Sequence, residues 1–411
     1  MRFIYNIGIG ITGFVLKCIG LFNEKIKKGV TGRNAAFEIL KSNLCASDKT
    51  LWFHCASLGE YEQGLPVFQK LRKHYYDYKI ILSFFSPSGY DIRKNSPIAD
   101  VVVYLPLDTK RNAKRFLDLV HPKLTLFVKY DIWPNFLKEL GHRNLRAILI
   151  SASFRKTQIY FKPYGGLFKK ALLSFEHIFT QNESSKSLLE SIGYQNVTVS
   201  GDTRFDRVTS QLESDNTLGF VEAFKQDKLC VVVGSSWPED EALFIEFINS
   251  RRNLGVKYIV APHNIKSGQI QNFASKLRAK TVLYSEKDNE ELKHFDVLII
   301  DTIGLLSKIY SSSDIAYVGG AMGTTGLHNI LEPAVFGPPI VIGKNYIKFP
   351  EAQAMIDNGG VFSVSDQMGF NAILRKLIAD SDFRRLSGSK NTEFIKKNTG
   401  AVIQILNYLR I

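Results

Sequence analysis

The sequence predicts an α/β protein whose two doubly wound domains face a cleft and are preceded by an N-terminal membrane-anchor helix. Three observations lead to this fold class. Short runs rich in β-branched and aromatic residues alternate with helix-length segments, these runs are apolar on both faces, and one long apolar stretch stands at the N-terminus. Strands that are apolar on both faces belong to parallel sheets covered by helices on each side. A chain of 411 residues has room for two such domains.

The N-terminal apolar stretch, residues 3–22, is long enough to cross the hydrocarbon core of a bilayer. Asn6, Thr12 and Lys17 interrupt it, and no small-x-small cleavage site follows, so a cleaved signal peptide fits poorly. The segment is expected either to span the membrane or to lie along its surface as an amphipathic helix. Four basic residues come next, namely Lys25, Lys27, Lys28 and Arg33. They predict that the rest of the chain stays in the cytoplasm, against acidic lipid headgroups.

The remaining chain contains two sets of predicted strands separated by helix-length segments. The first set lies at 50–56, 79–85, 100–106, 123–129, 145–152, 177–180 and 196–201. A polar stretch at 211–220 follows, which we expect to be a linker or a connecting helix. The second set lies at 228–236, 256–262, 280–285, 296–301, 314–320 and 338–343.

These sets give the expected domain limits. We expect an anchor at 1–30, a first domain at 31–210, a second domain at 221–380 and a helical segment at 381–411. Ligands of doubly wound sheets bind outside the carboxyl ends of the strands. The site is therefore expected in the cleft between the two domains.

The charge of the chain indicates an anionic partner. Lysine and arginine number 53 against 39 acidic residues, which gives a net charge of +14. Acidic membranes, phosphorylated substrates and nucleic acid all fit such an excess. Nucleic acid fits least well, because the basic residues are dispersed rather than gathered in one stripe. The four cysteines show no CxxC or CxH spacing, which indicates a reduced compartment and no structural zinc.

The first candidate site residue is Glu60, in the run HCASLGEYEQG that follows the first predicted strand. A carboxylate at a strand-to-helix turn lies at the edge of the cleft, where it can take a proton from a substrate hydroxyl. The alternative is that Glu60 only caps the following helix and complements its dipole. The spacing alone does not decide between the two. Glu62 lies two residues further into the helix and is a weaker candidate.

The second candidate is the glycine-rich run VGGAMGTTGLHNILEPAVFGPPIVIG at 318–343. Glycines let the backbone approach a phosphate or a sugar, and we expect His328 and Asn329 to open a helix behind them. Glu332, in the first turn of that helix, is placed to accept hydrogen bonds from a ribose diol. The run therefore predicts a nucleotide site, although it is neither a GxGxxG fingerprint nor a P-loop.

Five further turns follow predicted strands. In the second half, the turn after 296–301 contributes Gly304, and the turns at 234–241 and 261–267 contribute hydroxyls and His263. In the first half, KYDIWPN contributes Lys129 and Asp131, and GDTRFDRV contributes Arg204 and Asp206. Arg204 is suited to binding a carboxylate or a phosphate. For Asp206 an interdomain salt bridge is expected. The sequence has no metal-binding motif, so metal-free chemistry is expected.

In this order, the motifs resemble the 3-deoxy-D-manno-octulosonic acid (Kdo) transferases of lipopolysaccharide biosynthesis, a glycosyltransferase family with the GT-B fold of two Rossmann-like domains. The resemblance covers the whole chain and rests on ASLGE, WPN, GDTRFD, GSSWPEDE and VGG…GLHNILEPA…GPPIVIG. It implies transfer of Kdo from CMP-Kdo to the lipid A precursor lipid IVA, with inversion and without a metal or cofactor. It also implies a location at the cytoplasmic face of the inner membrane, among acidic lipids.

The resemblance implies a role for each matching residue. Glu60 would be the general base, Arg204 would stabilise charge in the transition state, and Asp131 would take an acidic position of the catalytic domain. The CMP contacts would be Pro262, His263, Ile303, Gly304, Leu305, Asn329, Ile330, Leu331 and Glu332, with Glu332 on the ribose hydroxyls.

The sequence departs from the family pattern at two points. Where the family often has ETELWPN, this chain has Lys129 and Asp131, so one acidic role is lost or moved and the other side chain is shorter. Where the family has PRH, this chain has Ala261, Pro262 and His263, which removes an arginine from the nucleotide side. Neither departure touches Glu60 or the HNxLEP run.

Two other functions remain open at this point. A GT-B enzyme that uses a UDP-sugar would share the Glu332 argument but would not need SLGE at 57–60. A non-catalytic, membrane-tethered nucleotide-binding module would use Glu60 only as a helix cap. For a transferase, acceptor selection is expected in the loop at 153–166, where Arg155, Lys156 and Lys162 could hold phosphate.

Overall fold

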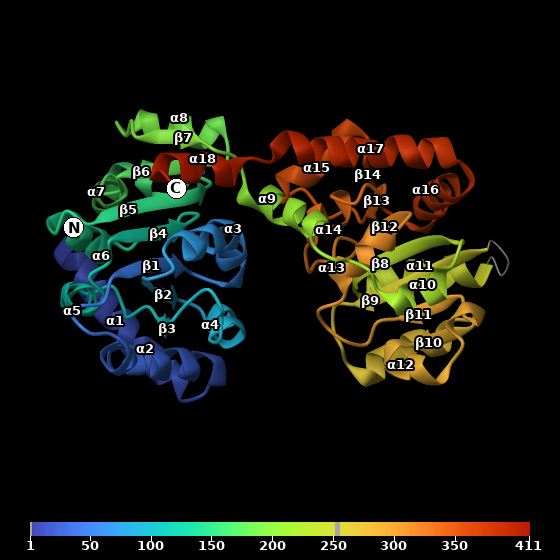
Figure 1. The fold of residues 1–411 in the computed structure, drawn as a ribbon, viewed down its shortest axis with the longest axis horizontal. Coiled ribbons are helices and arrows are strands. Elements are labelled where there is room, and N and C mark those ends of the chain that lie inside the picture. The colour runs from blue at the N-terminus through green and yellow to red at the C-terminus, as the bar shows by residue number, and fades with distance from the viewer. Residues whose placement is uncertain (1, 251–254) are drawn as a thin grey trace. The chain divides into compact units, whose positions relative to one another are not determined.

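The computed structural model describes residues 2–250 and 255–411, and it divides into two units. The first unit contains residues up to Arg207 together with Thr399–Ile411, and the second contains Val208–Asn398. Each unit is a parallel sheet of seven strands with helices on both faces (Figure 1). The predicted fold class, two doubly wound α/β domains after an apolar N-terminal helix, is confirmed.

The sheet of the first unit has the order β3-β2-β1-β4-β5-β6-β7. Its strands are β1 (Thr50–Cys55), β2 (Lys79–Phe84), β3 (Val101–Tyr104), β4 (Leu124–Val128), β5 (Arg146–Ala152), β6 (His177–Thr180) and β7 (Val197–Val199). Its helices are α1 (Arg2–Gly20), α2 (Glu24–Asn43), α3 (Leu58–His74), α4 (Pro87–Arg93), α5 (Lys110–Val120), α6 (Pro134–His142), α7 (Gly166–Leu172), α8 (Glu183–Ser191) and α18 (Ala401–Leu409). Between the two units runs α9 (Thr203–Ser210).

The second sheet has the order β10-β11-β9-β8-β12-β13-β14. Its strands are β8 (Leu229–Ser236), β9 (Val256–Pro262), β10 (Thr281–Leu283), β11 (Val297–Ile299), β12 (Ile315–Val318), β13 (Ile340–Ile342) and β14 (Val361–Ser363). Its helices are α10 (Gly219–Lys225), α11 (Pro238–Ser250), α12 (Ser267–Lys276), α13 (Leu306–Ile309), α14 (Leu331–Ala334), α15 (Pro350–Asn358), α16 (Gln367–Ala379) and α17 (Ser381–Asn398). All predicted strands are present, while β14 was not predicted. The polar stretch at 211–220 leads into α10.

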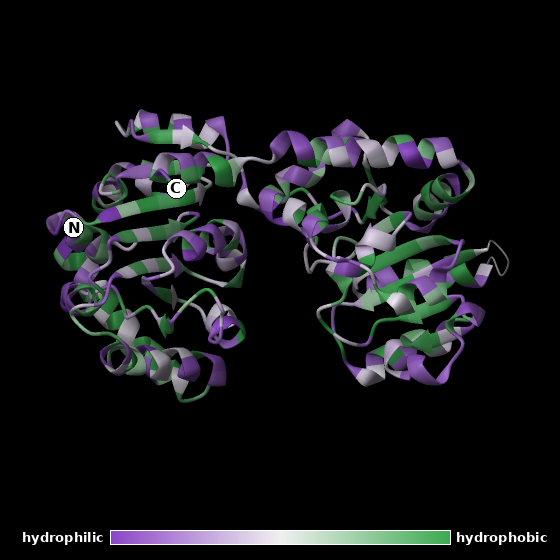
Figure 2. Ribbon diagram, in the orientation of Figure 1, coloured by the Kyte–Doolittle hydropathy of each residue, from purple (hydrophilic) through white to green (hydrophobic). Residues whose placement is uncertain are grey.

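Alternate residues of each strand fill the two faces of the first sheet. Trp52 and Phe127 point into one core, and Phe53 and Leu126 into the other, all of them fully buried. This alternation is the physical reason that the runs are apolar throughout, because each face is covered by helices. Figure 2 shows hydrophobic residues along the strands and hydrophilic residues on the covering helices.

The last helix, α18, belongs to the first unit although it follows the whole second unit in sequence. Val402, Ile405 and Leu409 pack into the core on the α3 side of the first sheet. Asp206 caps this helix, since its carboxylate accepts backbone N–H groups from Gly400 at 3.0 Å and from the following two residues. This role of Asp206 lies within the first unit, and an interdomain salt bridge stays a prediction.

The N-terminal helix α1 lies against the first unit through its polar residues. The Tyr5 hydroxyl donates to Asp108 at 2.6 Å, and the Asn135 amide donates to Asn6 at 2.9 Å. Asp108 is fully buried and also accepts the backbone N–H groups of Asn135 and Phe136, at the start of α6. Two residues near the start of the helix, Tyr5 and Asn6, thus attach it to the protein.

The opposite side of α1 is apolar and exposed. Its exposed residues include Phe3, Ile4, Ile7, Ile11, Phe14 and Val15. These positions recur every three to four residues and form one stripe along the helix. Within the described residues, α1 is the one helix with the length and hydropathy to cross a membrane, so it could anchor the protein.

Candidate active site

Glu60 lies where the sequence predicted, in the first turn of α3 just after the end of β1. Its side chain is partly exposed and accepts a hydrogen bond from the hydroxyl of Ser57. Ser57 occupies the N-cap position but makes no capping hydrogen bond with its own side chain. A carboxylate fixed by a hydroxyl at the carboxyl end of a central strand is suited to take a proton from a bound substrate.

Glu62 has a structural role. One of its oxygens lies 2.6 Å from the Arg93 guanidinium and the other 2.8 Å from that of Arg207. These two ion pairs tie α3 to α4 and α9. Both oxygens of Glu62 are thus engaged by arginines, and the preference for Glu60 rests on this difference.

Asp131 follows β4, the strand that pairs with β1. Its Oδ2 lies 2.6 Å from Nε2 of His54 and accepts from the Trp133 indole at 2.9 Å. His54 is fully buried in β1, and its Nδ1 lies 2.8 Å from the Ser83 hydroxyl. Sequence reasoning missed His54, because a single histidine in an apolar strand looks like an ordinary core residue.

The structure brings Glu60 and Asp131 together around Cys55, the last residue of β1. Burial raises the pKa of the Cys55 thiol well above its ordinary value, and the charges of Glu60 and Asp131 add to this effect. Two carboxylates thus lie at the carboxyl ends of neighbouring strands. Glu60 is held by one hydroxyl, whereas Asp131 is held by a buried ring, which suits Asp131 to a positioning role.

Arg204 lies in the first turn of α9, and its guanidinium is paired with Asp202 at 2.7 Å. The adjacent Thr203 donates to the backbone carbonyl of Gln63 at 2.5 Å, which brings α9 against the helix that carries Glu60. The resemblance assigns Arg204 to transition-state charge. The structure adds that this charge is already partly balanced by Asp202.

The backbone is strained at the same edge of the first sheet. Lys129, directly after β4, has a positive φ angle of 71°, and Ser151, near the end of β5, has one of 51°. Residues other than glycine adopt this region at a cost, and such strain collects at functional sites. The acceptor loop at 153–166 starts here, with Arg155 and Lys156 exposed and Tyr160 buried.

In the second unit, three predicted nucleotide-binding segments lie along one sheet edge. Pro262 ends β9 and His263 follows it, the turn of Ile303, Gly304 and Leu305 follows β11, and Asn329–Glu332 follow β12. In the strand order β11-β9-β8-β12, the turns after β11 and β9 are neighbours, and the turn after β8 lies between those after β9 and β12. Gly304 has a φ of +91°, and Ile303 is 84% exposed, so this turn presents backbone and an apolar side chain to solvent.

A stack of three rings joins these turns. The His263 ring lies 4.7 Å from the Trp237 ring at an angle of 19°, and 4.5 Å from the His328 ring. The Trp237 indole donates to Nε2 of His328 at 3.2 Å. His263 was a predicted nucleotide contact, whereas the roles of Trp237 and His328 were not foreseen.

The glycine loop after β12 is organised by a buried carboxylate, Asp240 of α11. Its oxygens accept from the backbone N–H groups of Trp237 at 2.9 Å and Gly320 at 2.8 Å, and from the Tyr317 hydroxyl at 2.7 Å. A Cβ on Gly319 would lie 2.4 Å from a backbone oxygen, so only glycine fits there. This loop could be recognised from its glycines, but Asp240 could not.

Asn329 and Glu332 form a unit of their own. The Asn329 amide donates to Glu332 at 3.1 Å and its oxygen accepts the backbone N–H of Leu331 at 3.1 Å. Helix α14 begins at Leu331 and has one turn, so the expectation that His328 and Asn329 open the helix is corrected. The side chains of Ile330 and Leu331, in the same turn, are buried. Asn329 thereby orients the carboxylate that was predicted to bind a ribose.

No group of three or more histidine, cysteine, aspartate or glutamate side chains that could hold a metal ion occurs in residues 2–250 and 255–411. All four cysteines are free. Metal-free chemistry remains a prediction, tested below.

His328 makes the stability of the second unit depend on pH. Burial, with the nearby His263, lowers the pKa of His328 to about 4. In the unfolded chain the imidazole takes up a proton near its ordinary value of about 6.5. Acid therefore favours the unfolded state, and this part of the stability is present above pH 6.5 and is lost as the pH falls towards 4. We expect urea midpoints between pH 7.5 and 5 to fall further for the wild type than for His328→Gln. Equal losses would contradict this assignment.

The two doubly wound sheets define a fold of the GT-B kind. Among solved structures, UDP-GlcNAc 2-epimerase from Neisseria meningitidis, bound to UDP-GlcNAc, matches with a TM-score of 0.62 and 18% identity, over 88% of this chain and 99% of that chain. A likeness at this identity shows the fold alone.

Sequence comparison finds similar proteins. Residues 30–207 match the family model described as 3-deoxy-D-manno-octulosonic-acid transferase (kdotransferase). The 3-deoxy-D-manno-octulosonic acid transferase of Haemophilus influenzae is 26% identical over 100% of this chain and 98% of its own length. The enzyme of that name from Aquifex aeolicus is 26% identical over 84% of this chain and 91% of its own length. The chain is thus similar to Kdo transferases, by the family model over 30–207 and by these relatives over most of its length.

Proposed function

We propose that this enzyme transfers Kdo from CMP-Kdo to lipid IVA, the phosphorylated lipid A precursor, with inversion and without a metal ion. Similarity to Kdo transferases supports the transfer of Kdo, and the motifs resembling those of CMP-Kdo enzymes support the donor. The observation that carries the mechanism is the position of Glu60 after β1, fixed by the Ser57 hydroxyl and close to Asp131.

In the proposed reaction Glu60 acts as the general base. It takes the proton from the primary hydroxyl of the acceptor sugar as that oxygen forms a bond to the anomeric carbon of Kdo. The bond from this carbon to the phosphate oxygen of CMP breaks, and CMP leaves with the electron pair. Attack on the face opposite to the leaving group inverts the anomeric centre. Arg204 would stabilise the negative charge that develops, and Asp131 would position the acceptor through its fixed geometry.

The second unit would bind the nucleotide. Glu332, oriented by Asn329, would accept hydrogen bonds from the ribose hydroxyls, and the loop after β12 would offer backbone N–H groups to the phosphate. Pro262, His263 and the turn of Ile303, Gly304 and Leu305 would contact the remainder of CMP. The ring stack of Trp237, His263 and His328 gives this edge a rigid wall.

The enzyme would work at the cytoplasmic face of the inner membrane. The exposed apolar stripe of α1 supports anchoring, and the net charge of +14 supports contact with acidic lipids and a phosphorylated acceptor.

The direct test is CMP release from CMP-Kdo, measured with and without lipid IVA and with and without a chelator. We expect release that depends on lipid IVA and is unchanged by EDTA. CMP binding without release in the presence of lipid IVA would overturn the proposed acceptor. Release from a UDP-sugar instead of CMP-Kdo would overturn the donor, and loss of activity with EDTA would overturn metal independence.

A further inference from the structure

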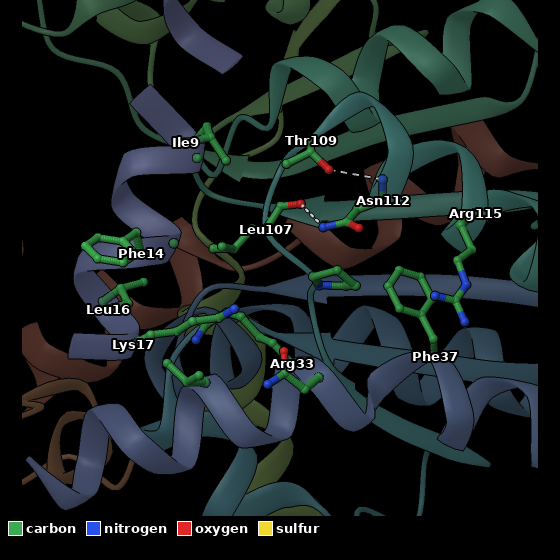
Figure 3. A pocket seen from close by; sticks show the side chains of 15 residues that line it. Ile9, Phe14, Leu16, Lys17, Arg33, Phe37, Leu107, Thr109, Asn112 and Arg115 are labelled. Atoms are coloured by element: carbon green, nitrogen blue, oxygen red, sulfur yellow. Dashed lines mark hydrogen bonds between the residues drawn. The ribbon is translucent and has the colours of Figure 1, made fainter. Parts of the chain in front are cut away.

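A groove of about 490 Å³ lies between α1, α2 and the segment that follows β3 in the first unit (Figure 3). Its walls combine polar residues with an apolar set made of Ile9, Phe14, Leu16, Val30, Phe37 and Leu107. On the α1 side, Gly10 contributes no side chain and faces open space, whereas at Gly13 the helix packs closely on Leu107. A space of this size and lining is typical of a site for a small molecule or a lipid chain.

The charged residues of the groove are all cationic. Lys17, Arg33 and Arg115 line it, and none of the lining residues is an aspartate or glutamate. Arg33 donates from Nη2 to the backbone oxygen of Phe85 at 2.5 Å, while its buried Nε has no hydrogen-bond partner. A buried guanidinium N–H without a partner favours an anion that can accept from it.

The groove is linked to the candidate active site through a short series of contacts. The Arg33 guanidinium lies 4.4 Å from the centre of the Phe85 ring, and that ring lies 4.8 Å from the Trp133 ring. Trp133 in turn donates to Asp131. A ligand in the groove therefore lies two aromatic side chains away from the carboxylates around Cys55.

The groove also meets the exposed apolar stripe of α1. Phe14 belongs to both, because it lines the groove and is 69% exposed. The apolar side of α1 and the groove thus meet at the Phe14 side chain. The walls, the cations and this shared side chain together fit a molecule with both acyl chains and phosphate.

We propose that this groove binds an acyl chain of the lipid acceptor, with an acceptor phosphate at Lys17 and Arg33. The inference rests on the proposed function and adds a lipid subsite to it. The groove then selects acceptors that carry acyl chains, while the sugar hydroxyl reaches Glu60. The first helix has a second role besides anchoring, since it forms one wall of the substrate site.

The test is a pair of matched variants on α1, Gly10→Leu and Gly8→Leu. Both glycines have open space where a Cβ would be placed, but Gly10 lines the groove and Gly8 does not. The two variants gain the same hydropathy and the same helix propensity. For Gly10→Leu we expect an approximately tenfold higher KM for lipid IVA and an unchanged KM for deacylated lipid IVA. For Gly8→Leu we expect wild-type values for both acceptors.

The other outcomes are distinguishable. Equal KM values for the two variants, or an equal rise with the deacylated acceptor, would overturn the subsite. Weaker binding of Gly10→Leu to phosphatidylglycerol vesicles without acceptor would assign the groove to bulk phospholipid and overturn the proposal too. If the wild type transfers no Kdo, the proposed function fails. Co-sedimentation of lipid IVA micelles with the two variants still decides the groove, because only Gly10→Leu should bind less.

Discussion

Replacing Glu60 by glutamine is expected to lower kcat about 1000-fold while the affinity for CMP and the free energy of unfolding stay near wild-type values. Glutamine keeps the shape of the side chain and can still accept the Ser57 hydroxyl hydrogen bond, but it cannot take a proton. General bases contribute about 10²–10⁴ to the rate, and a loss within this range is expected for each acceptor. The measurement is single-turnover CMP release with saturating lipid IVA.

The control is Glu62→Gln, two residues along the same helix. This variant loses charge opposite Arg93 and Arg207, so it should lower stability by about 1–2 kcal/mol and change kcat by only a few fold. A kcat for Glu60→Gln that equals that of Glu62→Gln would remove Glu60 from the mechanism. It would restore the alternative in which Glu60 only complements the helix dipole.

Replacing Asp240 by alanine is expected to lower the free energy of unfolding of the second unit by about 4 kcal/mol. The substitution leaves two buried backbone N–H groups, of Trp237 and Gly320, and the Tyr317 hydroxyl without their acceptor. Each unsatisfied buried donor costs about 1–3 kcal/mol. The glycine loop loses its fixed shape at the same time, so affinity for CMP should fall as well. Urea unfolding and CMP titration measure the two effects.

The matched control for Asp240→Ala is Glu246→Ala, an exposed acidic residue of the same helix. Both variants remove one carboxylate from α11, but only Asp240 contacts the loop. A loss of less than about 1 kcal/mol for Asp240→Ala, or a similar loss for Glu246→Ala, would show that the loop holds its shape without this carboxylate.

The strands could be predicted from the sequence because nearly every residue in them is buried. β1 and β4 are buried at each position, and their runs are apolar apart from a few polar residues. β14 could not be predicted, because it has three residues, of which only Val361 is buried, and so short a run has no recognisable apolar pattern. The limits of strands were extended by one or two residues where apolar positions continue into the turns.

The site residues at strand ends could be predicted for a different reason. In a parallel sheet all carboxyl ends meet at one edge, so any polar residue just after an apolar run is a candidate. Glu60 and Asp131 are found in this way, and Glu332 from the glycine-rich run before it. His54 and Asp240 could not be found, because their partners lie far away in sequence and only the fold brings them together.

The attachment of α1 was also beyond sequence reasoning. Asn6 interrupts an apolar run in the sequence, and in the structure it accepts a hydrogen bond from the Asn135 amide. Tyr5 finds Asp108 more than one hundred residues away. Long-range pairs of this kind leave no local pattern, so the sequence could predict an amphipathic helix but not which side faces the protein.

The position of α18 has a consequence for the order of folding during synthesis. The first unit needs Val402, Ile405 and Leu409 to cover one face of its sheet, yet residues 208–398 are translated first. At about 5–20 residues per second, the ribosome needs roughly 10–40 s to pass the second unit. During this time apolar surface beside α3 stays exposed on the nascent chain. The second unit is translated after most of the first unit, yet it can complete its core first, because it does not need α18. Until α18 emerges, the first unit exposes an apolar surface to which a chaperone can bind.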